Sequence, residues 1–264
     1  MNTGIIDKIA GRLAGWPHFL LASHLLMLHT LAFGGWKIPA IRLLWVGALG
    51  LFLIWQFWLF GWVMFWKYVD PGTTRFMEIR LGELRSKKPD AQLRKEWVPY
   101  ERISIHLKRA IIASEDAKFV DHEGFDWDGI QKAMEKNQKK GRFVAGGSTI
   151  SQQLAKNLFL TPNKSYFRKA EEAIITVMLE NLWDKHRIFE VYLNVIEWGN
   201  GVFGAEAAAR YYYGSNAAQL GPEQAAKLAG MVPNPRFYDR NRNAPGLARK
   251  TGIILARMPG AEVP

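Results

Sequence analysis

An uncharged apolar stretch, LLWVGALGLFLIWQFWLFGWVMFW, separates Arg42 from Lys67. A helix rises about 1.5 Å per residue, so residues 43–66 exceed the roughly 30 Å hydrocarbon core of a bilayer. Trp45 and Trp66 lie near its ends, where tryptophan favours the membrane–water interface. Core helices are rarely so long and apolar on every side, and the run begins too late for a cleaved signal peptide. We therefore predict a transmembrane helix.

A second uncharged run, residues 13–36, precedes this stretch and contains Pro17 and three histidines. It is compatible with a second span, an interfacial helix or a segment packed on the first span. The histidines do not share one helical face, so no ligand site is predicted there. Basic residues flank the span on both sides, so the positive-inside rule does not fix its orientation. The expected organisation is an N-terminal segment with an additional membrane-associated helix (1–42), the span (43–66), a connector that begins the main domain (67–102) and the remainder of that domain (103–264).

The chain after the predicted span is basic. The net charge is +11, and all but four of the 35 Lys and Arg and all but one of the 24 Asp and Glu follow Trp66. Such a charge suits nucleic acid, anionic lipid or an anionic substrate. No helix-turn-helix, finger spacing or aromatic–basic platform is present, so we do not expect nucleic acid as a partner. The chain has no cysteine, which excludes disulfides, Cys-ligated metals and thiol chemistry.

Helical periodicity dominates the chain beyond residue 102, and no run of alternating residues indicates a sizeable sheet. The domain is therefore predicted to be mainly α. The expected helices start at Ile103 and then cover 149–159, 166–182, 188–195, 205–213, 222–232 and a last segment that ends near 258. The strongly basic stretch 132–142 is predicted to be a mobile, solvated loop.

The stretch IIASEDAKFVDHEGFDWDGI places Glu115 and Asp116 where an apolar helix face ends, and His122 follows in a turn. A carboxylate at a helix end is commonly solvated. Where apolar packing stops, it can instead be partly desolvated, which raises its basicity and suits a general base. The spacing of these residues matches no metal-ligand motif, so no dedicated metal site is predicted.

Two further polar clusters each allow two interpretations. Thr149 and Gln152 have the spacing of a capping box, which is an ordinary helix start. A helix N-terminus also binds anions, and Ser148 and Lys156 lie close to this one in sequence.

Glu172 lies one turn after Arg168 and Lys169, on the apolar face of its own helix. Burying a lone charge is costly, so Glu172 is expected to have partners. It is either half of a structural ion pair or a second working carboxylate in a cationic pocket. Lys185 adds a further cation before the next helix.

The motifs EDAKFVDHEGFD, GGSTISQQLAKN, RKAEE, KHRIFEVYLN and GVFGAEAAARYYYG occur in this order. Their order and content resemble the five motifs of the bacterial peptidoglycan glycosyltransferases, over about residues 70–258. The chain is most similar to the monofunctional, membrane-anchored type of this family. The resemblance implies a lysozyme-like helical fold with two lobes and a cleft between them. It also implies polymerisation of lipid II on the outer face of the cytoplasmic membrane, inhibited by moenomycin.

On the family pattern, Glu115 is expected to be the general base and Glu172 the second essential carboxylate. The residues expected to bind the substrate are Asp116, Phe119, His122, Ser148, Thr149, Gln152, Gln153, Lys156, Asn157, Arg168, Lys169 and Lys185. The family pattern allows a divalent cation, Mg²⁺ or Mn²⁺, at the donor pyrophosphate near Glu172, and no organic cofactor. Other cell-wall synthesis or division proteins are the expected protein partners.

Two other functions fit parts of the pattern. A muramidase or lytic transglycosylase on a similar fold would also use a glutamate, but it needs a protonated acid and no pyrophosphate-binding cations. A membrane-tethered scaffold that binds wall precursors would need no base at all.

Overall fold

The computed structural model describes residues 31–33, 36–38, 40–142, 146–163 and 165–264. The chain divides into two compact units, Met1–Trp58 and Leu59–Pro264. The additional membrane-associated helix predicted within residues 1–42 falls largely outside the described residues. The described part of that segment contains two short strands, where β1 (Leu31–Phe33) pairs antiparallel with β2 (Trp36–Ile38).

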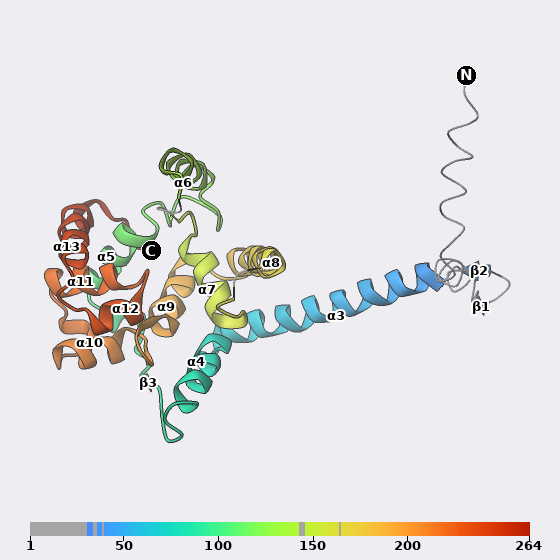
Figure 1. The fold of residues 1–264 in the computed structure, drawn as a ribbon, viewed down its shortest axis with the longest axis horizontal. Helices are drawn as coiled ribbons and strands as arrows, with labels where there is room; N and C mark the ends of the chain where they lie inside the picture. The colour runs from blue at the N-terminus through green and yellow to red at the C-terminus, as the bar shows by residue number, and fades with distance from the viewer. Residues whose placement is uncertain (1–30, 34–35, 39, 143–145, 164) are drawn as a thin grey trace, which may run out of the picture. The chain divides into compact units, whose positions relative to one another are not determined.

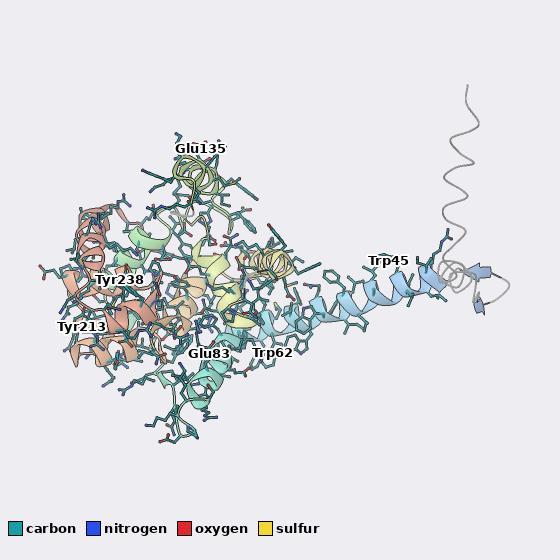
Figure 2. The ribbon with its side chains drawn as sticks, in the orientation of Figure 1. Trp45, Trp62, Glu83, Glu135, Tyr213 and Tyr238 are labelled. Carbon is teal, nitrogen blue, oxygen red and sulfur yellow. The ribbon has the colours of Figure 1, made fainter. Side chains whose placement is uncertain are left out.

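Helix α3 (Ala40–Tyr68) contains the whole apolar stretch. Within the described chain, it is the one helix long and apolar enough to cross a membrane. Its large side chains, including Trp45, project outward along its length (Figure 2), and Trp45 is 72% exposed. Exposed apolar surface of this extent is not stable in water, so α3 is consistent with the predicted membrane anchor.

The second unit is built from packed helices, as predicted (Figure 1). On one side, α5 (Ile105–Glu115), α11 (Pro222–Met231) and α13 (Pro245–Arg257) pack against one another, and on the other α7 (Ile150–Phe159) packs on α8 (Tyr166–Leu182) and α9 (Lys185–Val195). The remaining helices are α4 (Arg75–Arg85), α6 (Trp127–Lys140), α10 (Ala205–Tyr213) and α12 (Pro235–Arg240), with 3₁₀ turns at Tyr100–Arg102, Ala217–Gln219 and Met258–Gly260.

A small sheet joins the start of this unit to its middle. The strand order is β3 (Arg94–Lys95), β5 (Val202–Phe203) and β4 (Glu197–Gly199). Strands β3 and β5 are parallel, with Arg94 opposite Val202, whereas β4 and β5 are antiparallel. Gly204, directly after β5, has φ 84° and lies against the Asn194 carbonyl, so a side chain there would be strained.

Local sequence signals explain most helix boundaries. Thr149, Ser165 and Asp184 accept hydrogen bonds from the first turns of α7, α8 and α9, and Pro222 opens α11. The inward faces of these helices meet in a continuous core. Its largest fully buried side chains include Trp198, Tyr192, Phe119, Phe189, Phe203, Leu107 and Ile111.

The prediction of a loop at residues 132–142 is wrong. Residues up to Lys140 continue α6, which begins after the Asp126 cap and ends at Gly141 in the left-handed conformation (φ 61°). Lysine, glutamine and glutamate are good helix formers, so a cluster of lysines between an aspartate cap and a glycine stop forms a helix. Its high charge makes it exposed without making it irregular.

Candidate active site

Glu115 is the last residue of α5, whose inner face, including Leu107 and Ile111, is fully buried. Its side chain is half-buried and has neutral hydrogen-bond partners. Ser114 Oγ donates to Oε1 at 3.2 Å, and Gln153 Nε2 donates to Oε2 at 2.9 Å. Burial raises the pKa of the Glu115 carboxyl, although these two bonds and the charges of Lys250 and Lys156 oppose that rise. The result is a carboxylate poised to take a proton.

The side-chain amide of Gln153 is held in one orientation by Tyr192. Tyr192 OH on α9 donates to its Oε1 at 3.1 Å, which directs its NH₂ group toward Glu115. Asn157 Nδ2 donates to the backbone carbonyl of Gln153, one turn earlier in α7, at 2.7 Å. The pKa of the buried Tyr192 hydroxyl is raised, by burial and then by the charges of Glu115 and Asp116, so it remains a donor.

Asp116 is buried and connects the loop after α5 to the start of α7. Its Oδ2 accepts from the backbone N–H of Ile150 at 3.0 Å, at the N-terminus of α7, where the helix dipole stabilises a carboxylate. Its two oxygens lie 3.0 and 3.1 Å from His122 Nε2. Gly124 N–H donates to His122 Nδ1, so the proton is on Nε2, which donates to Asp116. This pair orders the loop.

The backbone N–H groups at the N-terminus of α7 are bound by side chains of the protein itself. Thr149 Oγ1 accepts from Gln152 N–H and donates to the Gly124 carbonyl at 2.7 Å, while Gln152 Oε1 accepts from Thr149 N–H. Of the two interpretations of this motif, the structure shows the capping box. With Asp116 already bound to Ile150 N–H, this helix start is occupied by a protein carboxylate.

Glu172, on α8, is 3% exposed and is paired with two cations. Arg168 Nη1 lies 2.6 Å from Oε2, and Lys169 Nζ donates to Oε1. Lys169 also reaches Ser148 Oγ at 3.3 Å. The i, i+3 and i, i+4 spacings place all three charged groups on one helix face.

Lys156, on α7, interacts electrostatically with both glutamates, Glu115 and Glu172. Burial lowers the pKa of its ammonium group; Glu172 opposes this, while Arg168 and Lys169 add to it, and Glu115 raises the pKa again. Within the part of the chain that the structure describes, no ion pair within 4.0 Å engages Lys156. Arg168 Nε is likewise buried without a hydrogen-bond partner among the described residues. The partly exposed Lys156 therefore leaves positive charge available to a ligand.

A pocket of about 380 Å³ opens beside this cluster. Gln153, Lys156 and Asn157 line one part of it, and Arg80 and Arg236 line another. The full lining comprises Phe76, Arg80, Gln153, Lys156, Asn157, Pro162, Ile196, Glu197, Val232, Pro233, Asn234, Pro235 and Arg236. Gln153 lines this pocket and also binds Glu115, so it connects the pocket to the carboxylate, although Glu115 itself does not line the pocket.

The predicted substrate-binding residues divide into two groups. Ser148, Gln153, Lys156, Arg168 and Lys169 are partly or fully exposed around the two glutamates.

The others hold the site together. Phe119, Thr149, Gln152 and Asp116 are buried and bound to protein groups. His122 binds Asp116, Asn157 binds the Gln153 carbonyl, and Lys185 binds Glu180 and the His122 carbonyl at 2.5 Å. These contacts position the site; that the same residues also bind substrate stays a prediction, and Asn157 lines the pocket as well.

Several residues of the site were not predicted from the sequence. Ser114 and Tyr192 complete the hydrogen bonding around Glu115, Lys250 acts on its pKa, and Arg80 and Arg236 line the pocket. The contact between Ser114 and Glu115 could have been predicted, because the two residues are adjacent in the sequence. The others come from distant segments and have no local signature.

Comparison with known proteins agrees with the motif pattern. A family model described as Transglycosylase matches residues 82–259. The chain is 81% identical over 224 residues to a protein of Dechloromonas aromatica (strain RCB) named biosynthetic peptidoglycan transglycosylase, with 85% of this chain and 97% of the relative covered. Proteins of the same name from Azoarcus sp. (strain BH72) and Chromobacterium violaceum are 65% and 64% identical, covering 83% and 81% of this chain and 94% and 93% of their own lengths.

Proposed function

The chain belongs to the transglycosylase family of peptidoglycan glycosyltransferases, and we propose that it polymerises lipid II with Glu115 as the general base. The observation that carries this role is the contrast in charge around Glu115. The Glu115 carboxyl has a raised pKa and neutral hydrogen-bond partners. The cation acting on it from α7, Lys156, also interacts electrostatically with Glu172. The acceptor sugar needs a base, and the departing diphosphate needs cations.

The proposed reaction is a single displacement. The 4-hydroxyl of the acceptor sugar attacks the anomeric carbon of the donor and gives its proton to Glu115. The new C–O bond forms as the bond from that carbon to the diphosphate oxygen breaks, and undecaprenyl diphosphate leaves. An α-linked donor thereby becomes a β-1,4-linked strand.

Gln153 and Ser114 keep the Glu115 carboxylate in place, and Lys156, Arg168 and Lys169 stabilise the diphosphate charge. Glu172 keeps Arg168 and Lys169 on one helix face before the substrate arrives. Both glutamates are then essential, but for different reasons.

The residues do not fit a dedicated metal site. Both oxygens of Glu172 accept from Arg168 and Lys169, and the described residues contain no group of three His, Cys, Asp or Glu arranged for a metal. A Mg²⁺ or Mn²⁺ ion would have to enter with the phosphates and keep much of its water. No step of the proposed reaction depends on it.

The test is an assay with purified full-length protein and lipid II. We expect long glycan strands, release of undecaprenyl diphosphate and inhibition by a moenomycin-type phosphoglycolipid. A raised pKa of Glu115 would also suit the protonated acid of a muramidase. Shortening of preformed glycan with lipid II left intact would establish that alternative, and binding of lipid II without turnover would establish a scaffold.

We also propose the cellular placement. Helix α3 would anchor the protein in the cytoplasmic membrane, with residues 69–264 on the outer face, where lipid II is polymerised. Other cell-wall synthesis or division proteins are its proposed partners. Protease treatment of spheroplasts should degrade the catalytic unit; protection until the membrane is disrupted would place that unit inside.

A further inference from the structure

The C-terminal end of α3 is hydrogen-bonded to residues in and just after the turn between α8 and α9. Within the second unit, Leu59 and Val63 of α3 are fully buried. Trp183 is itself 4% exposed, and its indole Nε1 donates to the Val63 carbonyl at 2.9 Å. Trp66 also packs on Phe159 of α7, with ring centroids 5.1 Å apart.

Arg187 adds to these contacts by capping the C-terminal end of α3. Val69 N–H still bonds to the Phe65 carbonyl at 3.1 Å, but the next carbonyl, that of Trp66, accepts from Arg187 Nη2 and Nε at 2.9 and 3.3 Å. The guanidinium also reaches the Val69 carbonyl at 3.2 Å. The last carbonyls of a helix have no partner within the helix and carry the negative end of its dipole, so an arginine suits this position.

The guanidinium is itself held from the other side. Asp70 and Glu190 accept from Nη1 at 2.9 and 2.7 Å, and the Arg187 side chain is only 13% exposed. Glu190 in turn accepts from the backbone N–H of Tyr100 at 3.1 Å. An arginine with five bonds to fixed groups is a rigid connection, unlike an exposed surface ion pair.

The same short turn also holds the catalytic loop. Lys185, two residues from both Trp183 and Arg187, binds the His122 carbonyl at 2.5 Å. His122 binds Asp116, the neighbour of Glu115. Residues 183–187 therefore fasten the end of the apolar helix and the loop after the catalytic glutamate to one another.

We infer that Trp183 and Arg187 are positioning residues that fix the catalytic loop relative to the end of the membrane helix. This inference rests on the proposed function, in which the reacting diphosphate is attached to a membrane lipid. In a bilayer that diphosphate lies at a fixed depth, so the height of Glu115 and its cations above the membrane decides how well they meet it. In a detergent micelle the lipid moves with its micelle, and this requirement is relaxed.

The experiment compares full-length Arg187→Ala with the wild type on lipid II in liposomes and in detergent micelles. We expect the initial rate to fall about tenfold in liposomes and less than about threefold in micelles, because small misplacements of reacting groups are costly. Trp183→Phe keeps an aromatic ring but loses the indole N–H bond and part of the buried ring, while Arg187 still caps α3, so its loss should be smaller and in the same direction. Arg187→Lys should restore part of the liposome rate.

Arg242→Ala is the matched control. Arg242 also binds a carboxylate, that of Asp239, and lies over the Tyr211 and Tyr212 rings, but it does not contact α3. Its liposome-to-micelle ratio should equal that of the wild type. An equal loss for Arg187→Ala in both media, or no loss in either, overturns the inference. A wild type inactive in both media would instead overturn the proposed function.

Discussion

Glu115 at the end of α5 and Glu172 on α8 lie around the same cluster of cations but have opposite partners. Neutral groups, Ser114 and Gln153, bind Glu115, and burial raises the pKa of its carboxyl. Two cations, Arg168 and Lys169, bind Glu172, which is almost completely buried. Two residues of the same type therefore have different uses: the first can accept a proton, and the second fixes positive charge.

This difference follows from where each glutamate lies on its helix. Glu115 ends α5, and the residues one turn before it, Ile111 and Ile112, are apolar, so its own helix supplies no cation. Glu172 follows Arg168 and Lys169 within α8, so its partners are supplied by its own helix. A base needs the first arrangement, because an ion pair would stabilise the carboxylate and weaken it as a base.

Glu115→Gln should give the largest effect. The amide cannot accept the acceptor's proton, and general-base catalysis contributes roughly 10²–10⁴-fold, so we expect polymerisation to fall about a thousandfold or more. The measurement is the initial rate with lipid II. Lipid II binding should persist, because the cations are untouched; loss of binding along with activity would mean that Glu115 has a structural role.

Glu172→Gln should be the second largest and should affect stability as well. It leaves Arg168, whose side chain is 17% exposed, without its carboxylate partner. Breaking a buried ion pair costs about 3 kcal/mol, most of it at Arg168, since Lys169 is 46% exposed and can be hydrated. Activity should fall about a hundredfold, because misplaced cations no longer stabilise the diphosphate.

A combined measurement separates the two glutamates. Chemical denaturation should show lower stability for Glu172→Gln and no loss for Glu115→Gln. If Glu172→Gln polymerises lipid II at a near-normal rate, Glu172 is only a structural ion pair and the contrast between the two glutamates is broken.

Gln153→Leu should give a smaller effect that sharpens the role of Glu115. The Gln153 amide lowers the pKa of Glu115, so its removal should move the acid limb of the pH–rate profile to higher pH. A hydrogen bond to a charged group is worth about 1.5–3 kcal/mol, part of which water can replace, so we expect about a fivefold loss near neutral pH. An unchanged acid limb would show that another group titrates there.

The contrast between the two glutamates could be predicted only in part from the sequence. The i, i+3 and i, i+4 spacing made the partners of Glu172 a local inference. The capping box and the proline start likewise gave α7 and α11, and helical periodicity gave α8, close to their observed bounds. The environment of Glu115 depends on Gln153 and Tyr192, which reach it through tertiary packing.

The features that could not be predicted from the sequence are contacts between residues far apart in the chain and one helix, α6. Arg80 binds Glu197, 117 residues away, at the edge of the pocket, and Arg187 reaches α3 across a similar separation. No local pattern records such contacts. The helix at Trp127–Lys140 was missed because its charge was interpreted as a loop, although its residues have good helix propensity.

The smallest effect concerns stability rather than rate. Because the folded-state pKa of Glu115 is raised, the folded protein retains this proton to higher pH than the unfolded chain does. Below the unfolded pKa of about 4.3, both states are protonated and burial costs nothing extra. As pH rises from there through the raised folded pKa, ionising the half-buried carboxyl destabilises the wild type, whereas Glu115→Gln has nothing to ionise. The difference in melting temperature between the variant and the wild type should therefore increase across this pH window and stay constant above it.

Glu78→Gln, which removes an exposed partner of Arg75, is the control, and its melting-temperature difference from the wild type should not change with pH. A gap that narrows as pH rises would mean that Glu115 is stabilised as a carboxylate, and it could not then differ from Glu172 in the way the base mechanism requires.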